Sequence, residues 1–132
     1  MKTRVLIADD ALFMRALIRG VLEGSGRYEI AGDATTGPEV LEMYPRLRPA
    51  IVTMDVVMPG MNGIETTRRL LALDPSACIV VCTAVGQQAL VLESIAAGAR
   101  DFIVKPFTEE RVLCVLDALA ASIRPAGVLP GD

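Results

Sequence analysis

The sequence feature that most constrains the fold is a set of short, almost purely aliphatic runs. They cover residues 4–8, 51–55, 78–82 and 102–104. Strands that are apolar at nearly every position are buried on both faces, as in a parallel sheet covered by helices. A fifth segment, 28–34, alternates apolar with polar or small residues and predicts a strand near the edge of the same sheet.

The segments between these runs carry apolar residues at helical spacing. They predict helices over residues 12–23, 37–44, 64–73, 87–97 and 109–123. Pro45 lacks an N–H donor, so we expect the second helix to end there or to bend. Thr108 is a suitable N-cap for the last helix. Five strands alternating with five helices predict an α/β fold with a doubly wound, five-stranded parallel sheet.

Composition excludes several classes of protein. The chain has 132 residues, of which 52% are hydrophobic, enough for one domain with a real core. A net charge of −3 argues against a nucleic-acid partner. The apolar runs are too short for membrane insertion and the first residues show no signal-peptide pattern, so we expect a cytoplasmic protein.

The cysteine and histidine contents limit the chemistry further. Cys78 and Cys82 lie four residues apart on a predicted strand, about 13 Å, too far to form a disulfide. The third cysteine, Cys114, leaves an odd count without metal-binding spacing. There is no histidine, which excludes serine triads, histidine acid–base catalysis and most zinc sites.

Polar residues stand where the predicted strands end. They are Asp9, Asp10, Asp55, Thr83 and Lys105. The carboxyl ends of parallel strands share one edge of the sheet, where ligands bind in doubly wound folds. We therefore expect these residues to meet. Taken singly they are unremarkable, since Asp10 could cap the first helix, Asp55 could be a paired structural acid and Lys105 a solvated lysine.

The combined set predicts magnesium-dependent phosphoryl chemistry. Two carboxylates about 4 Å apart repel by roughly 4 kcal/mol at an effective dielectric near 20, so three acids favour a divalent cation. Oxygen-only ligands suit Mg²⁺. Lys105 and Thr83 supply a charge and a hydroxyl for phosphate oxygens. Asp55 remains as the nucleophile, the role of carboxylates that form aspartyl phosphates.

Over residues 3 to 123 the chain resembles bacterial two-component response-regulator receiver domains, most like the single-domain chemotaxis type. The motifs that carry the resemblance are Asp9-Asp10, Asp55 with the following Met58-Pro59-Gly60-Met61-Asn62-Gly63, Thr83-Ala84 and Lys105-Pro106-Phe107. The resemblance implies a flavodoxin-like sheet with strand order 2-1-3-4-5. It also implies a receiver domain over residues 1–124 and a C-terminal tail over 125–132.

The resemblance implies a role for each residue of the site. Asp55 would accept a phosphoryl group from the phosphohistidine of a histidine kinase. Mg²⁺ would be held by Asp9, Asp10, Asp55 and the backbone carbonyl of Val57. Lys105 and Thr83 would contact phosphoryl oxygens. The protein would be a signalling phosphoprotein that assists its own phosphorylation and slow dephosphorylation, rather than an enzyme.

The resemblance also implies a switch. Thr83 would move toward the phosphate, Phe102 would change rotamer with it, and the Lys105–Pro106 bond would be cis. The hydroxyl often found at the position of Phe102 is absent. In the family, the positions of Val57 and Val85 flank the path of the hydrolytic water; because neither residue can orient a water, we expect slow self-dephosphorylation and an external phosphatase.

The predicted helices 87–97 and 109–123 have more apolar residues than one buried stripe needs. We interpret them, with the strand 102–104, as a docking surface for a downstream partner such as a flagellar motor switch protein. The other interpretation is extra burial.

Alternative families fit less well. A phosphatase of the haloacid-dehalogenase type needs a second acid two residues after the nucleophile, where this chain has Val57. Two acids after the first strand are hostile to the FMN phosphate of a flavodoxin, and no glycine-rich nucleotide motif follows that strand. The main alternative is a receiver domain excised from a longer regulator, such as a chemotaxis methylesterase or a transcription factor.

Overall fold

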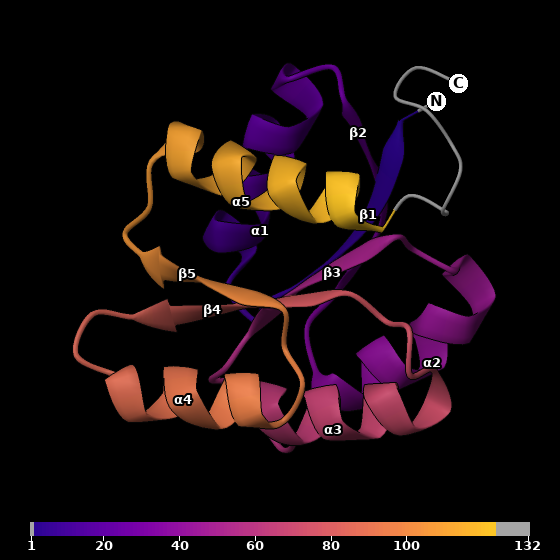
Figure 1. The fold of residues 1–132 in the computed structure, drawn as a ribbon, viewed down its shortest axis with the longest axis vertical. Helices are drawn as coiled ribbons and strands as arrows, with labels where there is room; N and C mark the ends of the chain where they lie inside the picture. The colour runs from indigo at the N-terminus through magenta and orange to yellow at the C-terminus, as the bar shows by residue number, and fades with distance from the viewer. Residues whose placement is uncertain (1, 124–132) are drawn as a thin grey trace.

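A computed structural model describes residues 2–123 and shows a parallel sheet covered by helices on both faces (Figure 1). The elements are β1 (Thr3–Ala8), α1 (Leu12–Gly24), β2 (Tyr28–Ala34), α2 (Gly37–Leu47), β3 (Ile51–Asp55), α3 (Gly63–Leu73), β4 (Ile79–Ala84), α4 (Gln88–Ala96), β5 (Asp101–Lys105) and α5 (Glu109–Ser122). The strand order is β2-β1-β3-β4-β5, with every neighbouring pair parallel. The predicted fold and strand order are confirmed.

The aliphatic strands are buried because helices cover both faces of the sheet. Along β1, Val5 and Ile7 pack with α1 and α5, whereas Leu6 packs on the opposite face with α2 and α3. Figure 1 shows this division, with α1 and α5 on one side of the strands and α2, α3 and α4 on the other. The edge strand β2 is less completely buried, as its alternating sequence predicts.

Helix α2 does not end at Pro45, so that part of the sequence prediction is wrong. The helix continues to Leu47. Pro45 lies in the last turn, where its missing N–H removes a single hydrogen bond from the helix. Arg48 is the C-cap of the helix, and its left-handed φ of 48° leads the chain into Pro49.

Cys78 and Cys82 are not joined by a disulfide, as their spacing on the strand predicts. Cys78 and Cys82 are buried free thiols, whereas Cys114 is exposed on α5. Burial raises the pKa of Cys82 to about 12, which keeps that thiol protonated.

The sequence also predicts that the chain does not insert into a membrane and that a tail follows the receiver domain. Among residues 2–123, no helix is long and apolar enough to cross a membrane. The predicted tail, residues 125–132, lies outside the described residues.

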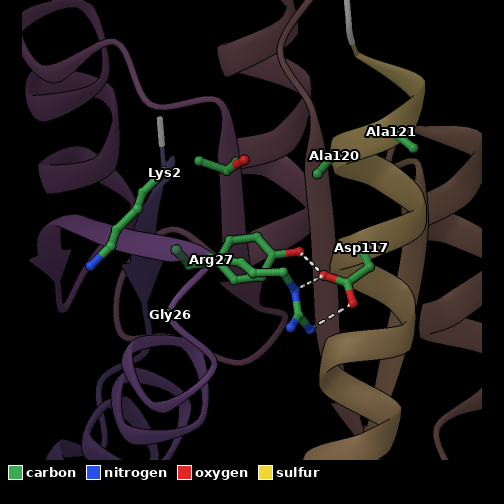
Figure 2. Close-up of a pocket in the computed structure, with 8 residues that line it drawn as sticks. Lys2, Gly26, Arg27, Asp117, Ala120 and Ala121 are labelled. Carbon is green, nitrogen blue, oxygen red and sulfur yellow. Dashed lines mark hydrogen bonds and ion pairs between the residues drawn. The ribbon is translucent and has the colours of Figure 1, made fainter. Parts of the chain in front are cut away.

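A polar clamp joins β2 to α5 at the amino ends of the strands, the end of the sheet opposite the predicted site (Figure 2). The Arg27 guanidinium donates to the Asp117 carboxylate over 2.9 and 3.3 Å, and the Tyr28 hydroxyl donates to Asp117 Oδ1 over 2.5 Å. Burial and the bond to Asp117 raise the pKa of Tyr28, so its hydroxyl remains a donor.

Candidate functional site

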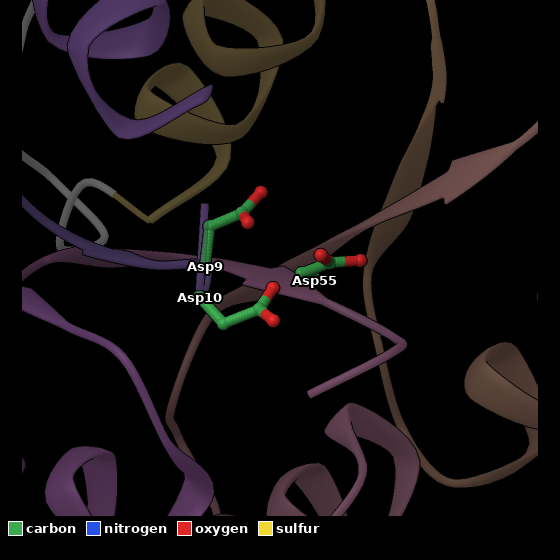
Figure 3. A group of neighbouring side chains, drawn as sticks. All are labelled: Asp9, Asp10 and Asp55. Carbon is green, nitrogen blue, oxygen red and sulfur yellow. The ribbon is translucent and has the colours of Figure 1, made fainter. Parts of the chain in front are cut away.

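The structure brings the three predicted acids together at the carboxyl ends of β1 and β3 (Figure 3). Carboxylate oxygens of Asp9, Asp10 and Asp55 lie within 4.8 Å of one another. Asp9 and Asp55 are buried, at 1% and 8% exposure, whereas Asp10 is exposed. Such a set of oxygen ligands, with one open side, fits a divalent cation that retains water ligands.

Backbone donors orient the two buried acids. Asp9 Oδ1 accepts the N–H of Ala11 over 2.9 Å, and Asp55 Oδ1 accepts the N–H of Val57 over 3.2 Å. Ala11 is the N-cap of α1, and among residues 2–123 no side chain caps that helix. Asp10 is therefore not a helix cap, and the alternative interpretation of this residue is wrong.

The glycine-containing loop after Asp55 folds back onto the end of β3. The N–H of Gly63 donates to the carbonyl of Val56 over 2.8 Å. A Cβ added at Gly63 would lie 2.2 Å from the carbonyl oxygen of Asp55, so only glycine fits. The next helix begins there because Asn62 caps α3, accepting the N–H of Glu65 over 2.9 Å. The loop thus sets the backbone position of Asp55.

Lys105 lies between the two buried acids. Its Nζ is 2.9 Å from Asp9 Oδ2 and 3.2 Å from Asp55 Oδ2. Burial and the neighbouring Asp9 raise the pKa of Asp55, with Lys105 acting in the opposite direction. Burial lowers the pKa of Lys105, but the two carboxylates outweigh it and raise that pKa overall. The predicted cis bond between Lys105 and Pro106 is present.

Thr83 stands at the end of β4, one residue beyond the register partner of Asp55, which is Cys82. Thr83 is only 2% exposed. Its hydroxyl donates to Gln87 Oε1 over 3.0 Å. Sequence reasoning assigned no role to Gln87; the available signal was an amide side chain four residues after Thr83, at the start of a helix.

The predicted docking surface is apolar on α4 but not on α5. Leu92 and Ile95 of α4 are 72% and 43% exposed. Beside them, a hollow lined by Thr83, Val91 and the half-buried Phe102 connects α4 to β5. In α5, the apolar residues Val112, Val115, Leu116 and Leu119 are buried in the core, and Leu113 is half-buried. The surplus of apolar residues on α5 is therefore extra burial, whereas a docking role for the surface of α4, β5 and α5 stays a prediction.

A second apolar patch, to which the sequence assigned no role, lies on α1 beside the site. Leu12 and Phe13 are both 71% exposed and Leu17 is 42% exposed. Phe13 and Leu17 line a hollow together with the Lys105-Pro106-Phe107 segment. Ile18 and Leu22 bury the other face of α1, so the helix has apolar residues on two faces.

Comparison with known proteins identifies the family. Residues 5–117 match the family described as response regulator receiver domain. The chain is 52% identical over 120 residues to the chemotaxis protein CheY of Thermotoga maritima, covering 91% of this chain and 99% of that protein. It is 44% identical to the chemotaxis protein CheY of Listeria monocytogenes over 117 residues, covering 89% and 98%.

A solved structure agrees with these relatives. The CheX-CheY-BeF3-Mg²⁺ complex from Borrelia burgdorferi contains a chain with a TM-score of 0.81 and 28% identity, covering 92% of this chain and 90% of that one. The matching strand order, the acids at the carboxyl edge and the sequence identity lead to one conclusion: the chain belongs to the response-regulator receiver domain family, and its relatives include CheY chemotaxis proteins.

Proposed function

We propose that this receiver domain is a phosphoacceptor switch in which Asp55 takes a phosphoryl group from the phosphohistidine of a histidine kinase. The observation that carries the proposal is the buried Asp55 carboxylate, placed at the carboxyl edge with Lys105 at 3.2 Å and two further acids within 4.8 Å. A purely structural ion pair would not need the third, exposed acid, Asp10, which caps no helix.

The transfer uses Asp55 as nucleophile. A carboxylate oxygen of Asp55 attacks phosphorus, the P–N bond to the donor imidazole breaks, and the imidazole leaves with that electron pair and takes up a proton from solvent. The N–H of Val57 holds the other carboxylate oxygen in place. Lys105, already at the carboxylate, donates to the arriving phosphoryl group.

The acids fit a bound magnesium ion. Asp9, Asp10, Asp55 and the carbonyl of Val57 would hold it, and when bound it would neutralise charge between the acids and the phosphoryl group.

The apolar patch of Leu12 and Phe13 on α1 adjoins the site and offers contact area for the phosphodonor protein.

The output is a change in the surface formed by α4, β5 and α5. Thr83 would move toward the phosphoryl group and open space for Phe102 to turn, which would alter the hollow beside Leu92. The names of the relatives favour a chemotaxis pathway, and the CheX-CheY complex favours binding to partner proteins. We propose that the protein acts in the cytoplasm, with a flagellar motor switch protein as target and a separate phosphatase. The second candidate is the receiver domain of a longer regulator, a methylesterase or transcription factor; the mass of the native gene product tests it.

Phosphorylation with acetyl phosphate and Mg²⁺ tests the core of the proposal. The wild-type protein should gain the mass of one phosphoryl group, and the label should be released by hydroxylamine, as acyl phosphates are. Asp55→Asn should gain none. Asp101→Asn, at the opposite end of β5, is the matched control and should behave as the wild type. Undiminished labelling of Asp55→Asn would contradict the assignment.

A further inference from the structure

The side chain of Gln87 closes the turn between β4 and α4 over Thr83. Gln87 precedes the first residue of α4, and its backbone N–H donates to the carbonyl of Ala84 over 3.3 Å. Gly86, with a φ of 91°, lets the chain reverse at that point. The turn brings the Gln87 amide back to the end of β4, where Oε1 accepts from both Thr83 and Ala84.

The hydrogen-bond partners settle which atom of the amide faces Thr83. The N–H of Ala84 lies 3.2 Å from the Gln87 side chain and can only donate, so the atom that receives it must be the oxygen. An amide oxygen can only accept, so the Thr83 hydroxyl, at 3.0 Å from the same atom, must be the donor there. The single hydroxyl proton of Thr83 is therefore committed to Gln87.

A phosphoryl group on Asp55 would compete for the same hydrogen-bond donor, the Thr83 hydroxyl. Its oxygens are acceptors, so Thr83 can contact them only as a donor. Thr83 is 2% exposed and lies one residue beyond the register partner of Asp55, so the hydroxyl is near the acceptor acid yet bonded elsewhere. We propose that Gln87 is a positioning residue, which holds the Thr83 hydroxyl in the unphosphorylated state and competes with the phosphoryl group for it. This inference rests on the proposed function of Asp55.

The competition has a consequence for the output surface. When a phosphoryl oxygen accepts the hydrogen bond from the Thr83 hydroxyl, Gln87 Oε1 keeps only its hydrogen bond from Ala84. The turn at the start of α4 is then held by fewer contacts. Gln87 and Thr83 both line the hollow that contains Leu92 and Phe102. Gln87 thus couples the occupancy of the site to the position of the first turn of α4.

The test measures the affinity of the full chain for beryllofluoride, a phosphoryl analogue, with Mg²⁺. Gln87→Leu removes the competing acceptor and should bind beryllofluoride about two- to tenfold more tightly, the range expected for one hydrogen bond. Gln87→Glu keeps an acceptor and adds a negative charge, so it should bind more weakly than the wild type. Gln88→Leu, an exposed neighbour, is the matched control and should equal the wild type.

Two further measurements separate this role from a general loosening of the turn. In a Thr83→Val background, Gln87→Leu should add nothing to beryllofluoride affinity, because no hydroxyl remains to compete for. Hydrogen exchange at the Ala84 amide should accelerate in Gln87→Leu and remain protected in Gln87→Glu. Unchanged exchange at Ala84 in Gln87→Leu, or an equal or weaker beryllofluoride affinity, would overturn the role of Gln87 while phosphorylation of Asp55 stood. A wild-type protein that takes no phosphoryl group on Asp55 would overturn both.

Discussion

Lys105 Nζ lies 3.2 Å from Asp55 Oδ2, although fifty residues separate the two in sequence. The contact places a positive charge beside the proposed phosphoacceptor. Lys105 is also 2.9 Å from Asp9, so it offsets part of the repulsion among the buried acids. One ammonium group thus bridges the acids at the ends of β1 and β3.

Removal of Asp10 should weaken magnesium binding without weakening the fold. A cation at a hundredfold excess over its Kd stabilises the wild type by about 2.7 kcal/mol, and a tenfold loss of affinity in Asp10→Ala lowers this to about 1.4 kcal/mol. Thermal unfolding with and without Mg²⁺ measures the difference. Glu29→Ala, an exposed acid at the other end of the sheet, should keep the full shift. An Asp10→Ala protein with the wild-type shift would exclude Asp10 as a ligand.

Substitution of Gly63 should displace the phosphoacceptor backbone. A Cβ at this position would lie 2.2 Å from the Asp55 carbonyl oxygen and 2.9 Å from Val56 Cα. Gly63→Ala should destabilise the protein by about 1–3 kcal/mol, as overpacking does, and should slow phosphorylation by acetyl phosphate. Gly20 lies on the exposed face of α1, and a Cβ added there would have no atom of the described residues within 4 Å, so Gly20→Ala should instead stabilise by about 0.5–1 kcal/mol. Urea unfolding and phosphorylation rates check both; equal behaviour of the two variants would contradict the packing argument.

The lifetime of the phosphoryl group should depend on Val57 and Val85. They are 58% and 73% exposed, and neither can hydrogen-bond a water. Val57→Asn and Val85→Glu supply groups that orient water, and each should speed phosphate release about two- to tenfold. Leu73→Asn, an exposed residue at the end of α3, is the control. Equal release rates in all four proteins would refute the prediction.

A charge on α4 should block partner binding and spare phosphorylation. Leu92 is 72% exposed, so Leu92→Glu costs little stability, whereas Leu116 is fully buried and Leu116→Glu should unfold the protein. Calorimetry with the proposed motor switch protein, in the presence of beryllofluoride, should show binding lost in Leu92→Glu and kept in Leu73→Glu. Phosphorylation of Asp55 should be unchanged within about twofold. If beryllofluoride altered amide exchange elsewhere but not in α4 and β5, the switch surface would lie elsewhere.

The clamp at the opposite end of the sheet should affect stability but not phosphorylation. Asp117→Ala leaves the hydroxyl of the buried Tyr28 without its acceptor and should cost about 1–3 kcal/mol. Asp117→Asn keeps an acceptor and should cost less, because the exposed pair with Arg27 contributes at most about 1 kcal/mol. Urea unfolding measures both, and an Asp117→Ala protein as stable as the wild type would contradict the role of the clamp.

The clamp also predicts a pH dependence. Burial raises the pKa of Asp117, but the bonds from Tyr28 and Arg27 outweigh it and hold that pKa below the ordinary value of 3.8. The contribution of the charged Asp117 is therefore complete above pH 3.8 and is lost as the pH falls through the folded-state pKa. The stability difference between wild type and Asp117→Asn should shrink over that window; a difference that stayed constant would contradict it.

The sequence by itself determined the fold and the members of the site. Aliphatic runs long enough for strands, separated by segments with helical patterns, predict a parallel sheet covered by helices, because such strands must be buried on both faces. The carboxyl ends of all the strands then lie at one edge of the sheet. This topology alone predicts that Asp9, Asp55, Thr83 and Lys105 are neighbours. The residues involved are strand-terminal and polar, so local pattern was enough to find them.

Only the tertiary structure decided which side chains contact one another and which faces are covered. The bond of Thr83 to Gln87 depends on the path of one turn, and periodicity does not describe such a path. Leu116 and Leu92 look alike in a helical pattern, yet one is buried and the other 72% exposed, because burial is set by the neighbouring elements. The sequence predicts that α2 ends or bends at Pro45, yet the helix continues to Leu47. A proline in the last turn removes one hydrogen bond, and packing supports the rest of the helix.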